Sequence, residues 1–280
     1  MMYKKNWLIT GVSGGLGRAL AKKVIAQGDY VFATFRKESH ANEFLFEVGN
    51  LHAQAFVLDV TEYEKVDQML ENIASQQLTI DVLVNNAGYG LLGAVEEASL
   101  QEVRLQMEVN FFAPLNLTQK VLPFMRKQES GHILQISSAA GFNATMGMGI
   151  YNASKYALEG FSQALALDLG ESPIKVTVVE PGPFRTQFGG TSHRTPAKKI
   201  DYYENTAHKL VNIIQSYSGT QDGDPVKAAN VIYQVVNSEN PPLHLPLGPH
   251  SIEKFETKMA EVQKDIDDWK AISSKTNFDS

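Results

Sequence analysis

Short apolar segments alternate with longer amphipathic ones along most of this chain. The apolar segments are rich in Val, Ile, Leu and Phe on both faces, as buried strands of a parallel sheet must be. The expected strands span residues 6–10, 30–35, 53–60, 81–87, 132–137 and 175–180. The expected helices span roughly 15–28, 38–48, 62–76, 99–128 and 152–170. This order predicts an α/β fold of right-handed β–α–β units, with one doubly wound parallel sheet and helices on both faces.

The regular alternation ends after Glu180. Residues 184–205 have no clean period and mix Gly, Pro, basic and aromatic residues, which is typical of a substrate loop or lid, and this segment extends to about 224. Asp224 followed by Pro225 predicts the start of a helix that ends near Asn237.

Two further elements complete the chain. Residues 241–248 suggest one more edge strand, and Ser251 begins a charged amphipathic helix that reaches about Ser273. We interpret this helix as a surface-packing or dimer helix rather than a catalytic element. The sequence therefore predicts one catalytic domain over residues 1–250 and a C-terminal helical extension of it over 251–280.

Composition excludes several classes of protein. A net charge of −6 disfavours general binding to nucleic acid or to anionic membranes. The absence of cysteine excludes disulfides, thiolate catalysis and zinc–thiolate sites. The first apolar run is too short for a signal peptide, and no stretch approaches the roughly 20 apolar residues of a membrane span. The expectation is a soluble cytoplasmic protein.

A glycine-rich loop, "TGVSGGLG", follows the first expected strand and leads into a helix. Glycines in this position allow a tight turn and let backbone N–H groups approach a pyrophosphate at the helix N-terminus. The G-x-G-x-x-G fingerprint is absent, and the glycines fit both T-G-x-x-x-G-x-G and T-G-x-x-G-x-x-G. The loop predicts a dinucleotide site, against the alternative of an ordinary strand–helix turn.

The end of the second expected strand bears on the choice of cofactor. An acid there would bind the ribose 2′-hydroxyl of NAD, but this chain has Phe35, Arg36 and Lys37. Arg36 is suited to charge-assisted hydrogen bonds with a 2′-phosphate. We therefore expect NADPH to be preferred over NADH, the alternative being that Arg36 is only a solvated surface residue.

The segment "YNASK" places the Tyr151 phenol and the Lys155 ammonium one helical turn apart on the same face. This spacing arises easily by chance, so it gains meaning only from its neighbours. Seven segments occur in order, namely "TGVSGGLG", "LDV" (58–60), "NNAG" (85–88), "VNFF" (109–112), "ISSAAG" (136–141), "YNASK" and "PGPFRT" (181–186).

Together these segments resemble the short-chain dehydrogenase/reductase family, in its branch with a TGxxxGxG loop and a YxxxK pair. The resemblance covers residues 5–186 with motifs and extends to 248. Members that are similar around residues 31–36 and 180–186 include bacterial carbonyl reductases and steroid- and retinol-type dehydrogenases. The resemblance implies a Rossmann-type fold and an oxidoreductase that interconverts a carbonyl and an alcohol by hydride transfer.

The resemblance also implies roles for residues at the matching positions. The catalytic set would be Asn110, Ser138, Tyr151 and Lys155, with Ser137 a weaker candidate for the serine. Besides Asn110, Tyr151 and Lys155, the residues expected to contact the cofactor are Gly11, Ser13, Gly15, Leu16, Gly17, Arg36, Asp59, Val60, Asn86, Ala87, Gly88, Pro181, Gly182 and Thr186.

Carbonyl reduction explains why these residue types are needed. The oxygen gains negative charge and must receive a proton, which Tyr151 can supply if its pKa, ordinarily about 10, falls by roughly 3 units. Lys155 and an oxidised nicotinamide favour the phenolate, and Ser138 can hydrogen-bond the substrate oxygen. In the family, the residue at Asn110 holds a water that links the lysine to solvent. Alternatively, Ser138 caps the following loop and Asn110 only bonds to backbone.

Apolar residues in the later loops predict a hydrophobic ketone, aldehyde or alcohol as substrate. The candidate contacts, besides Ser138, are Phe142, Met146, Met148, Phe184, Phe188, Tyr202 and Tyr203. These side chains fit core or oligomer packing nearly as well, and Arg185, Arg194, Lys198 and Lys199 leave an acidic substrate possible. Two other functions stay open, namely a nucleotide-sensing protein without catalysis and a redox-neutral epimerase or dehydratase. The family resemblance further implies a homodimer or homotetramer formed through residues 99–128 and 152–170.

Overall fold

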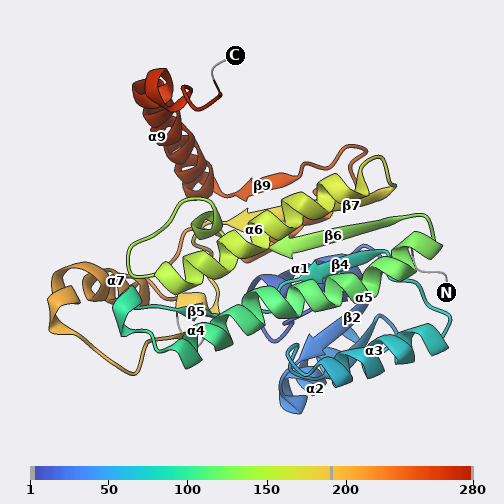
Figure 1. The fold of residues 1–280 in the computed structure, drawn as a ribbon. Coiled ribbons are helices and arrows are strands. Elements are labelled where there is room, and N and C mark those ends of the chain that lie inside the picture. Colours follow the sequence, from blue (N-terminus) through green and yellow to red (C-terminus); the bar gives the residue numbers. More distant parts are fainter. Residues whose placement is uncertain (1–3, 190–191, 279–280) are drawn as a thin grey trace.

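One parallel sheet organises the molecule. The computed structural model describes residues 4–189 and 192–278. Seven strands pair in the order β3-β2-β1-β4-β6-β7-β9, and every pair is parallel (Figure 1). Their bounds are Asn6–Ile9 (β1), Tyr30–Phe35 (β2), Ala53–Val57 (β3), Val82–Asn85 (β4), Gly131–Ile136 (β6), Ile174–Pro181 (β7) and His244–Leu247 (β9). The predicted doubly wound sheet is confirmed, including the late edge strand, which is β9.

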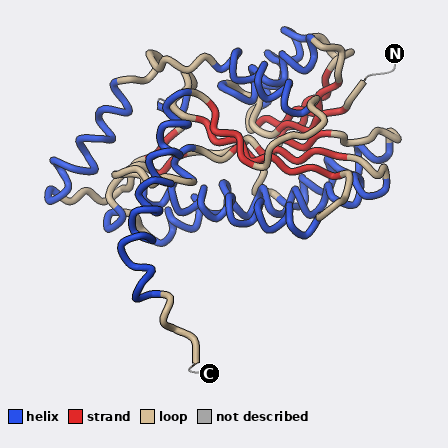
Figure 2. Tube along the Cα trace, turned by 90° about the horizontal axis from the view of Figure 1, so that it is seen from above, coloured by secondary structure: helices blue, strands red, loops and turns tan. Residues whose placement is uncertain are grey.

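Helices cover both faces of the sheet (Figure 2). Residues of α1, α2 and α8 pack in one hydrophobic cluster, and residues of α3, α5 and α6 pack in a second cluster on the other face. The helices span Gly15–Ala26 (α1), Glu38–Val48 (α2), Tyr63–Ser75 (α3), Leu100–Met107 (α4), Ala113–Lys127 (α5), Gly149–Leu169 (α6), Lys209–Ser216 (α7), Pro225–Val236 (α8) and Pro249–Ser273 (α9). None of the helices in the described part of the chain is both long and apolar enough to cross a membrane.

The long helix expected over 99–128 is interrupted. Between α4 and α5, residues Glu108–Phe112 form a π-helical turn, in which the N–H of Ala113 donates to the carbonyl of Glu108, five residues back. Pro114 follows directly and has no N–H to offer a helical carbonyl four residues earlier. The wider turn accommodates this loss, and such turns occur often at functional sites. Asn110 lies within it and is fully buried.

The segment expected to be a lid contains more regular structure than predicted. A π-helical turn over Glu204–His208 leads into α7. Neither element was predicted from the sequence. A short strand, β8 (His193–Arg194), pairs with β5 (Gly90–Leu91). The buried Glu97 carboxylate accepts hydrogen bonds from the Ile200 N–H and from His208. These contacts fasten residues 193–208 to the body of the domain.

Helix α9 begins at Pro249, two residues before the predicted start. The Ser251 hydroxyl does not cap this helix, because it donates to the carbonyl of Glu180 at 2.6 Å. Asp224 behaves as predicted and accepts a hydrogen bond from the Val226 N–H at the start of α8.

Candidate active site

The glycine loop joins the carboxyl end of β1 to α1. Gly11 and Gly15 have φ angles of +73° and +58°, in the left-handed region that favours glycine. The Asn86 amide donates to the carbonyls of Thr10 and Gly11, at 2.8 and 3.1 Å. A Cβ on Gly17 would lie 2.7 Å from the Gly11 oxygen and collide with the Asn86 amide. The loop and the segment after β4 are therefore locked to each other.

The amino end of α1 fits a diphosphate. The N-cap residue, Gly14, has no side chain with which to cap this end, no acid lies in the first turn, and the nearest atom to a Cβ on Gly14 would lie at 4.0 Å. Ser13 is exposed beside it, and Leu16 lies in the first turn of the helix. Free N–H groups at such a helix end attract anions. The predicted pyrophosphate contacts thus lie together in a suitable setting.

The other predicted cofactor residues follow the carboxyl ends of neighbouring strands. Arg36 and Asp59 follow β2 and β3, and both remain accessible to solvent. Asp59 accepts hydrogen bonds from the Thr61 N–H and hydroxyl. A Cβ on Gly15 would lie 3.2 Å from Thr186, which places Thr186 beside the glycine loop. The set is completed by Val60 after Asp59, by Ala87 and Gly88 after Asn86, and by Pro181 and Gly182 at the end of β7.

Tyr151 and Lys155 lie on α6 and are both buried. The Lys155 ammonium lies 5.9 Å from the centre of the Tyr151 ring and donates to the carbonyl of Ile136 at 2.7 Å. A Cβ on Gly88 would lie 3.8 Å from that ammonium, so the segment after β4 reaches the same place. The structure thus brings the tyrosine, the lysine and the predicted nucleotide-binding segments together at one edge of the sheet.

Burial dominates the protonation of this pair. It raises the pKa of Tyr151 to about 12, although the hydrogen bond with Ser138 acts in the opposite direction. Burial also lowers the pKa of Lys155 to about 8, while the nearby Glu159 carboxylate raises it. The tyrosine is therefore held as a neutral phenol, and the low tyrosine pKa expected from the chemistry stays a prediction for the complex with an oxidised nucleotide.

Asn110 and Ser138 make the backbone contacts that the alternative interpretation anticipated. The Asn110 side chain both accepts from the Tyr89 N–H and donates to the Tyr89 carbonyl, at 3.2 and 3.0 Å. It also donates to the Ser154 hydroxyl, which in turn donates to the Tyr151 carbonyl. Ser138 accepts from the Ala140 N–H at 3.1 Å and caps the turn after β6. These hydrogen bonds do not test the catalytic roles expected for Asn110 and Ser138, which stay predictions.

Two of the predicted substrate residues lie next to Tyr151. Met148 shares its buried cluster, and the ring of Phe188 lies 5.3 Å from its ring. The cluster also contains Leu92 and Val211, which the sequence interpretation did not include. The surroundings of the phenol are thus apolar on this side.

The remaining substrate candidates lie elsewhere. Phe142 stacks on Phe255 of α9 at 4.0 Å, and Phe184 packs against the core cluster that contains α8. Met146 is exposed, and Tyr202 is 87% exposed, with its ring against that of Tyr203. The structure does not bring these four residues to Tyr151, and their contact with substrate stays a prediction.

A buried acidic cluster behind Lys155 was not predicted. Glu159 lies one turn beyond Lys155 on α6, and Glu180 lies near the end of β7. His244 of β9 lies 2.7 Å from a Glu180 oxygen and 3.8 Å from a Glu159 oxygen. Burial raises the pKa of Glu159 to about 7 and, together with the Glu159 charge, that of Glu180 to about 9. No sequence signal marks such a pair, because acids one turn apart from a lysine are usually solvent-exposed.

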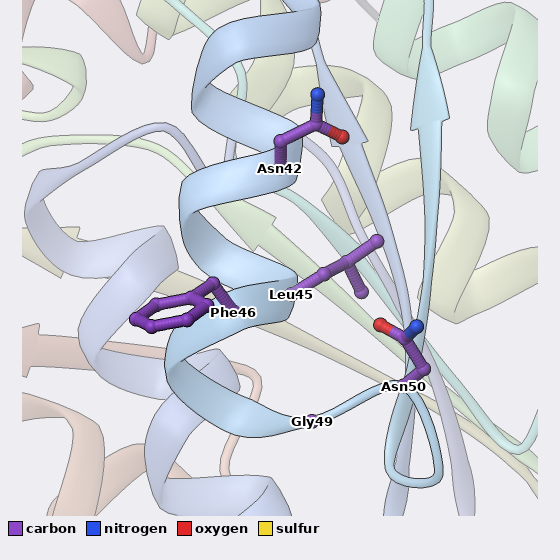
Figure 3. Close-up of a pocket in the computed structure, with 5 residues that line it drawn as sticks. All are labelled: Asn42, Leu45, Phe46, Gly49 and Asn50. Carbon is purple, nitrogen blue, oxygen red and sulfur yellow. The ribbon is translucent and has the colours of Figure 1, made fainter.

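A shallow hollow of about 380 Å³ lies at the end of α2, between Asn42 and Asn50 (Figure 3). Leu45 points toward the adjacent strand, whereas Phe46 points away from it. Gly49 and Asn50 precede β3, so this hollow is at the amino edge of the sheet. It lies at the opposite edge from the tyrosine and the glycine loop and is a separate surface feature.

Comparison with known proteins identifies the family of the chain. Residues 5–197 match the family model of the short chain dehydrogenases. The chain is 38% identical over 244 residues to a 3-ketodihydrosphingosine reductase of Bacteroides thetaiotaomicron, covering 86% of this chain and 87% of that protein. It is 37% identical over 205 residues to an NADPH-dependent 3-dehydrocapnine reductase of Ornithobacterium rhinotracheale, covering 70% and 72% of the two chains.

A solved structure agrees over nearly the whole length. A short-chain dehydrogenase from Streptomyces avermitilis superposes with a TM-score of 0.92 at 35% identity, covering 99% of this chain and all of that one. The extent of the family match, together with these identities, establishes both the fold and the general chemistry, which is oxidoreduction at a CH–OH group. This chain belongs to the short-chain dehydrogenase/reductase family.

Proposed function

We propose that the protein is an NADPH-dependent reductase of an aliphatic ketone on a long hydrophobic substrate. The observation that carries this proposal is the position of the buried Tyr151 phenol. It is hydrogen-bonded to Ser138, close to Lys155 and bordered by apolar side chains at the edge of the sheet that bears the glycine loop. The nicotinamide cofactor, when bound, supplies the hydride that reduces the carbonyl carbon.

Tyr151 then supplies the proton. Burial, which raises its pKa to about 12, keeps the phenol protonated near neutral pH in the free protein, and donation to the substrate oxygen uses the lower pKa expected once the nucleotide is bound. The Ser138 hydroxyl donates a hydrogen bond to the same oxygen as negative charge develops there. The Lys155 ammonium stabilises the phenolate that remains, since opposite charges in a buried site attract strongly. Asn110, held against Tyr89 and Ser154, keeps this part of α6 in place.

The apolar surroundings of Tyr151 support a hydrophobic substrate. Phe188 is partly buried beside Tyr151 and can contact an alkyl chain, and the buried Met148, Leu92 and Val211 make the surroundings apolar. Two related proteins are named for 3-ketodihydrosphingosine and 3-dehydrocapnine. Both names denote a ketone, which agrees with the mechanism proposed for Tyr151.

A substrate panel tests this function. NADPH oxidation should be fastest with long-chain 3-keto amino compounds, slower with short aliphatic ketones and slowest with steroid ketones. The measurement is kcat/KM for each compound at equal ionic strength. Bound NADPH without turnover of any member would favour the nucleotide-sensing alternative, and turnover of a nucleotide sugar with no net oxidation would favour the epimerase alternative.

Arg36 is proposed to select NADPH by binding its 2′-phosphate. Replacing Arg36 with aspartate should lower the ratio of kcat/KM with NADPH to that with NADH by about 10- to 100-fold, which is the value of one or two charge-assisted hydrogen bonds. Lys37→Asp, an identical charge change at the next exposed position, is the control and should alter the ratio far less. An unchanged ratio in Arg36→Asp would assign the preference to other residues.

The same helices that the family uses for assembly also expose apolar side chains here. Phe112, Tyr156 and Leu167 are exposed on the π-helical turn and on α6. We include in the proposal a homodimer or homotetramer formed through α5 and α6. Its mass in solution is measured by light scattering.

A further inference from the structure

Helix α9 begins against the body of the molecule and then projects away from it (Figure 1). Ser251 and Phe255 are buried against the domain and anchor the helix to it. From Met259 to Phe278, every described residue is exposed. The roughly 15 helical residues after Lys258 are thus all exposed against the described part of the chain, although helices of this length are marginal in water without packing contacts.

Helix α9 carries a regular apolar stripe. Ile252, Phe255, Met259, Val262, Ile266 and Trp269 follow one another at intervals of 3, 4, 3, 4 and 3 residues. This is the a and d spacing of a coiled coil, which places all six on one face. Trp269 is 62% exposed and Ile266 is 50% exposed. We call the five of these other than Phe255 the α9 stripe, because Phe255 is already covered by Phe142.

The charges beside the α9 stripe favour a protein over a lipid surface or nucleic acid. The helix carries six carboxylates and four lysines, a net charge of −2, in a chain whose net charge is −6. Helices that bind anionic membranes are instead rich in lysine and arginine on their polar face. Mixed charges flanking an apolar seam are typical of helices that pair with other helices.

The charges of Lys258 and Asp265 indicate which helix would pair with the α9 stripe. Both lie directly before an a position, on the same side of the α9 stripe. When two copies of α9 run antiparallel, positions on this side face each other, so Lys258 of one copy lies opposite Asp265 of the second. The two-fold axis makes this ion pair twice. The same alignment sets Ile252 against Trp269 and Met259 against Val262.

We propose that the α9 stripe is an interface at which α9 of a second copy of this chain docks antiparallel. This interface is distinct from the one through α5 and α6. It does not depend on the identity of the substrate, and its failure would leave the proposed reaction untouched.

The first test introduces one charge into the seam. Ile266→Glu should increase the dissociation constant of the assembly at least about tenfold, because it places a charge in the apolar seam. Ala271→Glu adds the same charge on the opposite face of the helix and should leave the constant within about twofold. Light scattering over a concentration series gives the masses, and kcat with NADPH should be unchanged in both variants. Equal masses for wild type and Ile266→Glu at all concentrations would overturn the proposal.

The second test examines the antiparallel pairing. Lys258→Glu and Asp265→Lys should each weaken the assembly by about threefold or more, and the double variant should restore it, since the swapped charges still meet. A parallel pair would not be restored, because it places position 265 opposite Lys270. Trp269 provides a direct signal, since the other tryptophan, Trp7, is fully buried, so dilution should shift the emission to longer wavelength. If the wild-type protein has the same mass as Ile266→Glu and also sediments with phosphatidylcholine vesicles, the α9 stripe binds a lipid surface instead.

Discussion

Replacing Tyr151 with phenylalanine is expected to lower kcat for carbonyl reduction by about a thousandfold or more. The substitution removes only the phenol oxygen, which is the group proposed to protonate the substrate. General acid catalysis contributes 10²- to 10⁴-fold, and the hydrogen bond to the developing oxyanion is lost with it. The affinity for NADPH, measured by fluorescence titration, should change far less than kcat, because the glycine loop and α1 stay intact. Single-turnover kinetics with a saturating ketone measures the chemical step directly.

Tyr156→Phe is a matched control on the same helix. The Tyr156 hydroxyl donates to the carbonyl of Phe142 at the surface and lies outside the buried cluster of Tyr151. We expect this variant to retain kcat within about threefold and to show that loss of a phenol from α6 is not itself damaging. Normal turnover by Tyr151→Phe would refute the proposed mechanism, whereas loss in both variants would point to a general effect on α6.

The overall fold could be predicted because its strands are buried on both faces. Such strands appear as continuous apolar runs, and helical segments between them require parallel pairing. The π-helical turn at Asn110 could not be predicted in this way, since it depends on how one proline shifts the hydrogen bonds of a regular helix. Helix α7 was missed because its neighbours are held by Glu97 and His208, a contact between distant parts of the chain.

The candidate site also contains residues that could be predicted from the sequence and residues that could not. The glycine loop, Tyr151 and Lys155 are specified by local spacing, and the structure places them at one edge of the sheet. The residues that contact substrate could not be predicted in this way, because some aromatic residues of the same segments pack against other parts of the protein instead. Phe142 is covered by α9 and Phe184 by the core, so both look like pocket residues in the sequence but are engaged in packing. The burial of Glu180 could not be predicted at all, because no neighbouring residue in the sequence indicates that this acid is fully buried.

Stability should fall as pH rises because of Glu180. Its pKa is raised from 4.5 to about 9 in the folded protein, by burial first and by the Glu159 charge second. Between these two values the folded state binds a proton that the unfolded state has released, so the free energy of unfolding decreases with pH. The contribution is fully present below pH 4.5 and is lost as pH rises toward 9. One such proton corresponds to about 1.4 kcal/mol per pH unit, or about 2 kcal/mol between pH 6.5 and 8.0.

Glu180→Gln removes this ionisation while keeping the shape of the side chain. The difference in unfolding free energy between variant and wild type, from denaturant titrations, should therefore move by about 2 kcal/mol in favour of the variant between pH 6.5 and 8.0. Comparing the two proteins at each pH cancels the opposing contribution of His132, whose pKa burial lowers to about 4. Glu159, whose pKa burial raises to about 7, is coupled to Glu180, so its titration forms part of the measured difference. Glu171→Gln, an exposed acid in the turn after α6, should show no such change. A difference independent of pH would mean that Glu180 is ionised throughout this range, with His244 as its charged partner.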